Sequence, residues 1–391
     1  MAPIRWSKYS GFSNGDIRMK IALVTDSYYG ENGACITTVR LAKELRKRGH
    51  RVSVVSTDAN GEGFYMVKGK RPFFMKESLK KMEFFFGIPE KAVLRKAFTD
   101  ADIIHIQYPF YLGYGAAKMA RSMHKPVIAG FHVQPHNLTS AMGKESKLLE
   151  RILFEFFKFF LFKRVPIIQC PSRFAADLLK KGRIKCRLEV VSNGIPDEYI
   201  PRKYARPEWF GDNFVLMSLG HHVLGKRPLL MIEGVKRSKY AGKIKLLLCG
   251  KGVLSEQLIA AGAQLPVPPL VRFVTQEEKL QYLNTADLFI HASAAELESL
   301  ACLEAIGCGL PCLVGNSPHS AASQFALNHR FSFEHDNAGH LAEKINYWFE
   351  NRDQLLKIRE QVKAMAEQYR FAKCIDKMEN LYRETIRASD A

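Results

Sequence analysis

The sequence lacks several features that mark common classes of protein. None of its eight cysteines forms a C-x-x-C pair, and no apolar run reaches the roughly 18 residues that span a bilayer. Scattered cysteines exclude a disulfide framework and are typical of reduced, buried thiols. The first 18 residues hold no apolar segment of a secretory signal. No G-x-G-x-x-G follows the first predicted strand, which argues against a dinucleotide-binding site.

The charge is distributed unevenly over the 391 residues, which carry a net charge of +19 with His neutral. Residues 1–200 contain 34 Lys and Arg against 18 Asp and Glu, whereas residues 201–391 contain 24 against 21. An excess of basic residues in one half predicts an anionic partner for that half. Nucleic acid and an anionic membrane surface are the two candidates.

Short apolar runs alternate with amphipathic helical segments along the whole chain. Residues 35–48 carry apolar side chains at helical spacing with basic residues opposite, and Gly49 ends this helix. Strands that alternate with helices are typical of parallel α/β sheets. The predicted strands form two series: 21–25, 52–56, 103–106, 126–129, 166–170 and 188–191, then 214–219, 244–248, 271–274, 288–290 and 312–314.

The two series predict two Rossmann-like domains, separated by a stretch rich in proline and charge at 195–212. We expect the first domain at 19–197, the second at 198–369, and a C-terminal crossover helix with its tail at 370–391. Residues 1–18 are expected to be a disordered extension, because Met19 opens the first strand directly.

The segment AAELESLACLEAIGCGLP, residues 294–311, is the most informative part of the chain. Glu296 follows a predicted strand, and Glu304 lies eight residues later in a predicted helix that glycines and a proline end. A helix that begins after a strand offers an anion site, because its first amides have no partner within the helix. Two carboxylates beside that site suit a ligand with both hydroxyls and phosphate, such as a nucleotide sugar.

The E-x7-E spacing, followed by EAIGCGLP, resembles the signature of the retaining glycosyltransferases of family 4. The resemblance extends from Met19 to about Ile386. It implies the GT-B fold, in which two Rossmann-like domains with parallel sheets face a central cleft and the C-terminal helix crosses back to the first domain. It also implies transfer of a hexose with retained anomeric configuration. No metal and no cofactor are expected, in keeping with the lack of a D-x-D motif near the proposed donor site.

The family motifs also imply roles for individual residues. The catalytic residues implied are Glu296, His132 and Lys226. The donor-binding residues implied are Gly33, His221, Lys226, Glu298, Ser299, Leu300 and Glu304. In this assignment Glu304 accepts hydrogen bonds from the ribose hydroxyls, while Glu296 and the amides of residues 298–300 hold the sugar. Lys226 stabilises the charge that develops on the leaving diphosphate.

One position departs from the family pattern. The family usually has G-R-x-x-x-x-K after the first strand of the second domain, whereas residues 220–226 here read GHHVLGK, with His221 in the place of the arginine. An imidazole is neutral at pH 7 unless its pKa is raised, and it makes no bidentate phosphate contact. Three outcomes stay open: weaker phosphate binding by His221, compensation by His222 or Arg227, or reduced activity.

Aromatic residues interleaved with lysines in the basic half predict contact with a membrane. They lie in the segment 65–98. The residues expected to contact the membrane or a lipid acceptor are Phe73, Phe74, Lys76, Lys80, Lys81, Phe84 and Phe85. A second stretch, 144–164, places charges at 147, 151, 155 and 158 in one helical stripe. It fits an interfacial helix and a packed helix of the first domain equally well.

The run ELESLACLEAIGCGLP, followed by NSPHSAA, most resembles bacterial glucosyltransferases that act on diacylglycerol. We therefore predict transfer of glucose from UDP-glucose to 1,2-diacylglycerol by a cytoplasmic enzyme, peripheral on the inner face of the cell membrane. Another donor, or a soluble, polysaccharide or phosphoinositide acceptor, is the alternative. A basic Rossmann-like protein that binds nucleic acid fits the charge but not the carboxylate pair, so nucleic acid is not an expected partner. The oligomeric state stays open.

Overall fold

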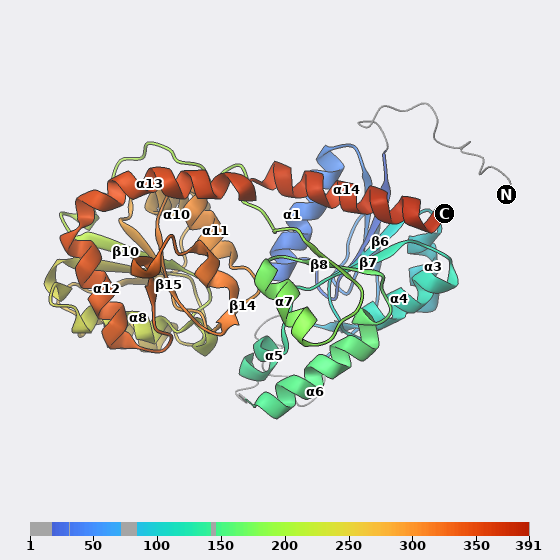
Figure 1. Ribbon diagram of the computed structural model, residues 1–391, viewed down its shortest axis with the longest axis horizontal. Coiled ribbons are helices and arrows are strands. Elements are labelled where there is room, and N and C mark those ends of the chain that lie inside the picture. Colours follow the sequence, from blue (N-terminus) through green and yellow to red (C-terminus); the bar gives the residue numbers. More distant parts are fainter. Residues whose placement is uncertain (1–17, 31, 72–83, 142–145, 391) are drawn as a thin grey trace. The chain divides into compact units, whose positions relative to one another are not determined.

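The computed structural model describes residues 18–30, 32–71, 84–141 and 146–390 (Figure 1). The predicted N-terminal extension lies outside these residues, apart from Arg18. Strands and helices alternate along the described chain, as the sequence predicts, and the main strands form two sheets.

The first sheet has seven strands in the order β3-β2-β1-β6-β7-β8-β9. The first strand pairs in parallel with a neighbour on each side, so that Ile21 lies opposite Val52 and Ile103. Its strands are β1 (Lys20–Val24), β2 (Arg51–Ser56), β3 (Phe64–Met66), β6 (Ile103–Ile106), β7 (Val127–Gly130), β8 (Ile167–Cys170) and β9 (Arg187–Val190).

The second sheet has six strands in the order β12-β11-β10-β13-β15-β17, and the paired strands are parallel. Its strands are β10 (Phe214–Leu219), β11 (Ile244–Cys249), β12 (Leu270–Arg272), β13 (Leu288–His291), β15 (Cys312–Gly315) and β17 (Ser332–Phe333). Two small pairs complete the strands: β4 (Gly69–Lys70) with β5 (Phe86–Gly87), and β14 (Ala295–Glu296) with β16 (His319–Ser320).

Several α-helices begin at residues whose side chains accept hydrogen bonds from free amides of the first turn. Asn32 caps the first helix through Cys35 N–H, and Thr275 forms a capping box with Glu278. The helices are α1 (Gly33–Lys47), α3 (Lys91–Thr99), α4 (Tyr111–Ser122), α5 (Pro135–Ala141), α6 (Lys147–Phe157), α7 (Arg173–Lys181), α8 (Pro228–Arg237), α9 (Ser255–Gly262), α10 (Gln276–Thr285), α11 (Leu300–Gly307), α12 (Ala338–Glu350), α13 (Arg352–Ala366) and α14 (Phe371–Asp390).

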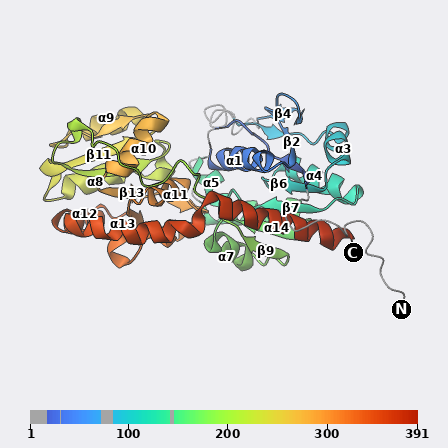
Figure 2. The same cartoon turned by 90° about the horizontal axis from the view of Figure 1, so that it is seen from above.

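The central strands β10, β13 and β15 of the second sheet are buried on both faces, which is why they are continuous runs of mainly apolar residues. Along β10, Val215 and Met217 pack in one hydrophobic cluster with α10, α11 and α13, whereas Phe214 and Leu216 pack in another with α8 and α12. Figure 1 shows these two groups of helices on opposite faces of the sheet. Figure 2 shows the same unit from above, with α9 and α10 at one edge and α12 and α13 at the other.

The helical pattern of roughly residues 340–386 predicts one long last helix, broken near Tyr369, whereas the structure has three helices in this region. The predicted break is present as a 3-10 turn, Glu367–Tyr369. A second break at Asn351 is an additional finding. This residue leaves helical geometry, with a φ of −113° and a ψ of 31°, and it ends α12 and begins α13.

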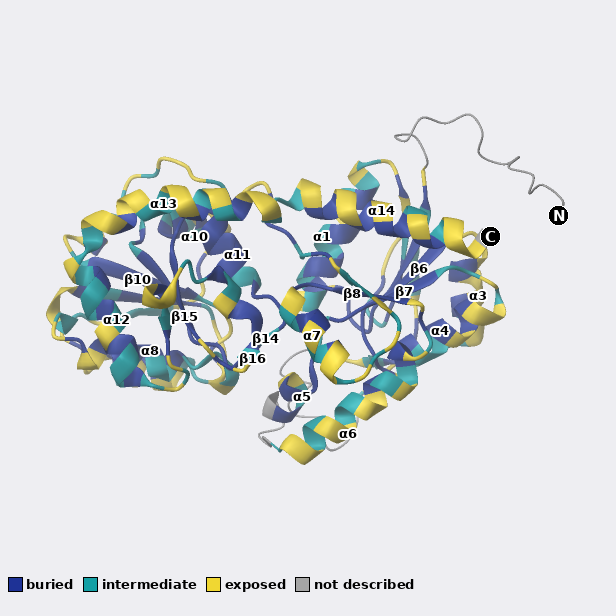
Figure 3. Ribbon diagram, in the orientation of Figure 1, coloured by how far each residue is buried: buried dark blue, intermediate teal, exposed yellow. Residues whose placement is uncertain are grey.

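The chain divides into two compact units. The first comprises the described residues of Met1–Gly130, Phe159–Ile167 and Asn380–Ala391, and the second those of Phe131–Lys158 and Ile168–Glu379. The last part of α14 therefore belongs to the first unit, where the Tyr382 hydroxyl lies 2.8 Å from His105 Nδ1. This confirms the predicted return of the C-terminal helix to the first domain. Figure 3 shows that the sheets form the buried interior of each unit.

Candidate active site

The strand order of the second sheet determines where a site can form. The first strand in sequence, β10, lies between β11 and β13, so the chain leaves it in one direction and later returns on its other side. Ligands of open α/β sheets bind at such a topological switch point, outside the carboxyl ends of the strands. The loops after β10 and β13 contain Lys226 and Glu296. A backbone hydrogen bond of 2.8 Å from the Ala294 N–H to the Gly225 carbonyl joins the two loops.

Lys226 and Glu296 form an ion pair between these loops. Lys226 is the last residue of a 3-10 turn, Leu224–Lys226, and Glu296 lies in the short strand β14. Burial by itself raises the pKa of Glu296, but the charges of Lys226 and His291 outweigh it and hold the pKa well below its usual range. The side chains are 35 % and 15 % exposed, so a ligand can reach both. At neutral pH the pair is ionised and already in place.

His291 lies behind this pair, at the end of β13, and is fully buried. Its Nε2 is 3.5 Å from Glu296 Oε1. Burial lowers the pKa of His291, but Cys302 and then Glu296 outweigh it and raise the pKa to about 9. His291 therefore gives Glu296 a second cationic neighbour. Sequence reasoning missed this residue, although a lone histidine in an otherwise apolar strand directly before the Glu296 loop was a usable signal.

The helix start predicted in residues 294–311 is present. Ser299 caps α11 by accepting a hydrogen bond from the Cys302 N–H, and Leu300 is the first helical residue. Ser299 has a φ of 87°, in the left-handed region that side-chain-bearing residues rarely adopt. Such strain is found where a turn must aim backbone amides at a ligand.

The side chain of Glu298 points away from the helix start. It is buried and accepts a hydrogen bond of 2.9 Å from the Asn193 N–H. Burial raises the pKa of Glu298 to about 7, against the smaller opposing effect of hydrogen bonds from Ser192 and Asn193. The side chain thus attaches the active-site turn to the segment 192–196. Only the backbone of Glu298 is available to bind the nucleotide-sugar donor, which is the role that the family motif implies for this residue.

Glu304 lies within α11 and is held by Lys279 from α10. The Lys279 Nζ is 3.2 Å from Glu304 Oε2 and 4.9 Å from the centre of the Tyr199 ring. Burial lowers the pKa of Lys279, but Glu304 and then Tyr199 outweigh it and raise the pKa. Sequence reasoning missed Lys279, because nothing in the sequence links α10 to α11.

The loop after β10 shows what replaces the family arginine. His221 is exposed, whereas His222 is buried and its Nδ1 lies 2.9 Å from the Ser255 hydroxyl. Arg227 donates to both oxygens of Asp336, at 2.8 and 3.3 Å. The side chains of His222 and Arg227 thus have structural partners inside the protein, and the side chain of His221 is exposed.

The remaining predicted site residues lie elsewhere in the chain. Gly33 begins α1 in the first unit, where the Tyr108 hydroxyl donates to Asn32 Oδ1 at 3.0 Å. His132 follows β7 and belongs to the second unit. Burial lowers the pKa of His132 to about 4, so its ring is neutral at neutral pH and can donate or accept a hydrogen bond.

The predicted membrane-contact residues are only partly described. Phe73, Phe74, Lys76, Lys80 and Lys81 lie outside the described residues. Phe84 is only 6 % exposed, and its ring packs edge-on against Tyr108 and Phe110. We therefore no longer assign Phe84 to the membrane surface, because its ring lies in the interior of the first unit. Phe85 is 36 % exposed, with the Arg71 guanidinium 3.7 Å from its ring centre.

Helix α6 presents an apolar row at its surface. Leu148, Ile152 and Phe156 follow one another at a spacing of four residues and are 69, 57 and 40 % exposed. Figure 3 shows α6 almost entirely in the exposed and intermediate classes. The opposite side packs on the end of α7, where Phe154 leaves no room for a side chain at position 182. This stretch therefore combines features of the packed helix and of the interfacial helix that the sequence predicts, because one side of the helix is packed and the other is exposed.

Among the described residues, every helix is too short or too polar to cross a bilayer.

Comparison with known families agrees with this geometry. The model described as "Glycosyltransferase Family 4" matches residues 32–199, and that described as "Glycosyl transferases group 1" matches residues 201–367. The chain belongs to family 4 of the glycosyltransferases and is a retaining hexosyltransferase with the GT-B fold. The family resemblance inferred from the sequence is thereby confirmed.

Two curated relatives cover most of the chain. An alpha-monoglucosyldiacylglycerol synthase of Streptococcus pneumoniae is 27 % identical over 84 % of this chain and 78 % of its own length. A GDP-mannose-dependent alpha-mannosyltransferase of Mycobacterium tuberculosis is 22 % identical over 75 % of this chain and 78 % of its own.

Solved structures show the same fold. HepE of Anabaena in complex with UDP and glucose superposes with a TM-score of 0.71 and 16 % identity, over 94 % of this chain and 100 % of that one. A sucrose-phosphate synthase of Thermosynechococcus elongatus superposes with a TM-score of 0.73 and 14 % identity, over 95 % and 100 % of the two chains. At these identities the likeness shows the fold.

Proposed function

We propose that this enzyme transfers glucose from UDP-glucose to 1,2-diacylglycerol at a membrane surface. The observation that carries the donor half of the proposal is the ion pair of Lys226 and Glu296 at the switch point of the second sheet. The acceptor half is supported by the name of the Streptococcus pneumoniae relative and by the basic first half of the chain. We also propose that the acceptor domain is 19–197 and the nucleotide-sugar domain 198–369.

In the proposed reaction the bond between the anomeric carbon and the diphosphate oxygen breaks, and a bond from that carbon to the acceptor oxygen forms on the same face. The acceptor hydroxyl passes its proton to the oxygen of the departing diphosphate, and UDP leaves. Negative charge grows on the leaving diphosphate, so a positioned cation lowers the barrier. Lys226 and the first amides of α11 would supply positive charge there, and His221 would add a hydrogen bond.

The sugar and the ribose would be held by carboxylates. Glu296 is ionised and would accept hydrogen bonds from sugar hydroxyls, with the amides of Ser299 and Leu300 alongside. His132 would contact the transferred sugar as a neutral imidazole. Glu304 has one oxygen bound to Lys279, and the carboxylate would accept hydrogen bonds from the ribose hydroxyls. Gly33 would line the acceptor side of the donor phosphates.

The lipid acceptor requires a docking surface, because the free hydroxyl of diacylglycerol lies at the depth of the lipid headgroups. We propose peripheral binding on the cytoplasmic face of the cell membrane. The exposed row Leu148, Ile152 and Phe156, with Lys147 and Arg151 beside it, has the composition of an interfacial helix. Lys76, Lys80 and Lys81 would add electrostatic attraction, at roughly 1 kcal/mol for each basic residue near an anionic surface.

The test is transfer from a panel of radiolabelled nucleotide sugars, UDP-glucose and GDP-mannose included. Acceptors are diacylglycerol in anionic vesicles, diacylglycerol in neutral vesicles, and soluble oligosaccharides. We expect glucose transfer to diacylglycerol, faster with anionic lipid, with α-linkage in the product. Transfer from GDP-mannose, or transfer to soluble acceptors with no need for lipid, would replace the donor or the acceptor in this proposal.

A further inference from the structure

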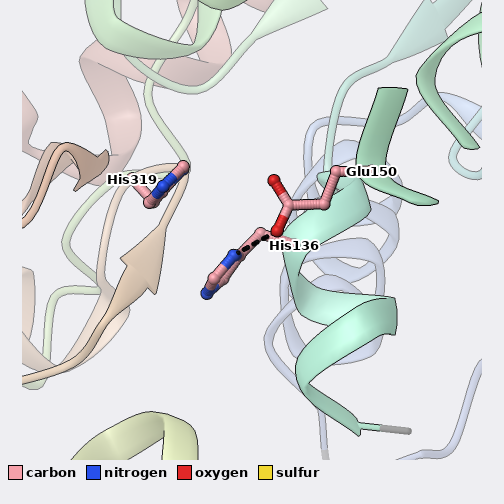
Figure 4. Close-up of side chains that lie close together, drawn as sticks. All are labelled: His136, Glu150 and His319. Carbon is pink, nitrogen blue, oxygen red and sulfur yellow. Dashed lines mark hydrogen bonds and ion pairs between the residues drawn. The ribbon is translucent and has the colours of Figure 1, made fainter. Parts of the chain in front are cut away.

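Three metal-ligating side chains from distant parts of the sequence meet in the second unit, outside the ion pair described above. They are His136 in α5, Glu150 in α6 and His319 in β16, and one ligand atom of each lies within 4.8 Å of the others. Figure 4 shows that the rings of His136 and His319 and the carboxylate of Glu150 turn toward one another. Among the described residues, no other group of three such side chains lies this close together.

The contacts within the cluster are specific. Glu150 Oε1 lies 2.8 Å from His136 Nδ1, and the two imidazole rings are stacked at 4.6 Å with an angle of 7° between their planes. The His136 Nε2 is buried and has no hydrogen-bond partner among the described residues. The protein by itself thus leaves one nitrogen of a nearly buried ring unsatisfied, which is uncommon in folded proteins.

We propose that His136, Glu150 and His319 bind a divalent transition-metal ion, with Zn²⁺ as the best fit. Two imidazoles and one carboxylate are a donor set that zinc uses widely, and they leave a fourth position for water. Cobalt, nickel and copper ions share the preference for imidazole, whereas magnesium and calcium prefer all-oxygen sites. Zinc binds nitrogen and oxygen at about 2.0–2.2 Å, so side-chain adjustments of roughly an ångström bring the three ligand atoms into range.

The surroundings hold the ligands in position. The Thr139 hydroxyl donates to Glu150 Oε1 at 3.4 Å, as expected of an outer hydrogen bond that orients a ligating carboxylate. The backbone of His319 is fixed on both sides: its N–H donates to the Ser317 hydroxyl at 3.2 Å, and its carbonyl accepts from Gln134 Nε2 at 3.0 Å. The exposed fractions of the His136 and Glu150 side chains are 10 and 19 %, so an ion can enter.

The site lies next to the strand that carries Glu296. β16 pairs with β14 so that His319 is opposite Ala295 and Ser320 is opposite Glu296. An ion on His319 would tie this pair of strands to α5 and α6. Its role would therefore be to fix the position of the Glu296 loop rather than to take part in the reaction, and the proposal holds whatever the acceptor is.

The experiment is zinc titration of the full-length, chelator-treated protein by calorimetry, with His136→Gln and His319→Gln as test variants. His329→Gln is the matched control, because His329 is an exposed histidine of the same unit outside the cluster. We expect one zinc ion per chain in the wild type and in the control. Each test variant loses one of three protein ligands, so its affinity should fall about tenfold or more.

Two further readouts separate this site from other causes. Zinc, but not magnesium, should raise the Tm of the wild type and the control and leave the Tm of both test variants unchanged. The cobalt-loaded protein should show d–d bands without a thiolate charge-transfer band, because the cluster contains no cysteine. The proposal is overturned if the wild type binds no zinc, if both variants bind zinc as the wild type does, or if a thiolate band shows that cysteines hold the ion.

Discussion

The two sheets share a topology but differ in the chemistry at their switch points. In each, the first strand lies between the second strand of its series and a later one. After β10 and β13 the switch point of the second sheet holds the ion pair Lys226–Glu296. After β1 and β6 the first sheet instead joins Tyr108 to Asn32, with Cys35 3.7 Å from the same hydroxyl. The same fold therefore has an ion pair at one switch point and a hydrogen bond between two neutral side chains at the other.

Burial keeps Cys35 and Tyr108 at the first switch point neutral. It raises the pKa of Cys35 and raises that of Tyr108 well above its usual range. The comparison shows that strand order determines where a ligand can bind, whereas individual side chains determine the charge of that position in the protein. Under the proposed function, the charged nucleotide would bind to the second unit and the uncharged acceptor hydroxyl to the first.

Removing the charge at the second switch point should have the largest effect. Glu296→Gln leaves Lys226 without its anionic partner and removes a charged acceptor for sugar hydroxyls. We expect kcat/KM to fall by about a hundredfold or more. Steady-state kinetics with both substrates measures the change, and Glu277→Gln on the exposed face of α10 is the control.

The corresponding variant at the first switch point is Tyr108→Phe, which removes an uncharged hydrogen bond to Asn32. Its kcat/KM should change by less than about tenfold, since one neutral hydrogen bond contributes about 1 kcal/mol. Equal losses in the two variants would contradict the assignment of the ionic chemistry to the second unit.

The basic half can be tested at the membrane. Lys76, Lys80 and Lys81 changed together to Glu should weaken binding to anionic vesicles about a hundredfold, at roughly 1 kcal/mol for each residue. Binding of the wild type should also fall with salt, because exposed charges are screened over about 8 Å at physiological ionic strength.

The control for this charge reversal is a variant in which three exposed lysines of the second half of the chain are changed to Glu. They are Lys236, Lys243 and Lys357. A separate variant with Leu148, Ile152 and Phe156 changed to Ser tests the apolar row of α6. Vesicle co-sedimentation and nucleotide binding are measured for all three. Normal vesicle binding by both test variants would remove the membrane role from these residues and favour a soluble acceptor.

The buried carboxyl of Glu298 should make the stability depend on pH. Its pKa is raised from 4.5 to about 7 by burial, so the folded state favours the protonated form. The stability that it contributes is present below about pH 4.5 and is lost as the pH rises through 7. Glu298→Gln should therefore raise the free energy of unfolding at pH 8 by about 1–3 kcal/mol and leave it nearly unchanged at pH 4.5. Denaturant titrations at the two pH values check this, and an equal effect at both would show that ionisation is not the cause.

Ser299 offers a test of backbone strain at the ionic site. Ser299→Ala removes the cap of α11 and keeps a side chain at a φ of 87°, so stability should fall by about 1 kcal/mol. Ser299→Gly also removes the cap but relieves the left-handed strain, and should be closer to the wild type. Thermal unfolding compares the two, and a glycine variant less stable than the alanine variant would show that the strain is small.

His221→Arg should have the smallest effect. It restores a permanent charge and a bidentate phosphate donor in a loop where the guanidinium of Arg227 is already bound to Asp336. We expect the Kd for UDP to fall severalfold. Calorimetry with UDP measures it, and unchanged or weaker binding would mean that position 221 does not face the diphosphate.

Much of the fold followed from local patterns. Apolar runs flanked by turns located most strands of both sheets, but the short edge strands β3 and β17 were missed. The helix that holds Glu304 followed from the strand, the polar turn and the glycines around it. The segments 187–190 and 270–272 were found within a residue or two for the same reason. The break at Asn351 was missed, because a single asparagine inside a long helical pattern gives no strong signal against helix.

The sequence by itself determined the class of the protein, because the E-x7-E segment and the alternating strands are local in the chain. The tertiary structure alone decided which side chains meet. His291 lies beside Glu296, Lys279 binds Glu304, and His136 faces His319, and in the last two pairs the partners are separated by 25 and 183 positions in the numbering. It also decided that Phe84 is interior and that α6 is open on one side. Local propensity fixes an element, but burial, pKa and ion pairing depend on neighbours that only packing brings together.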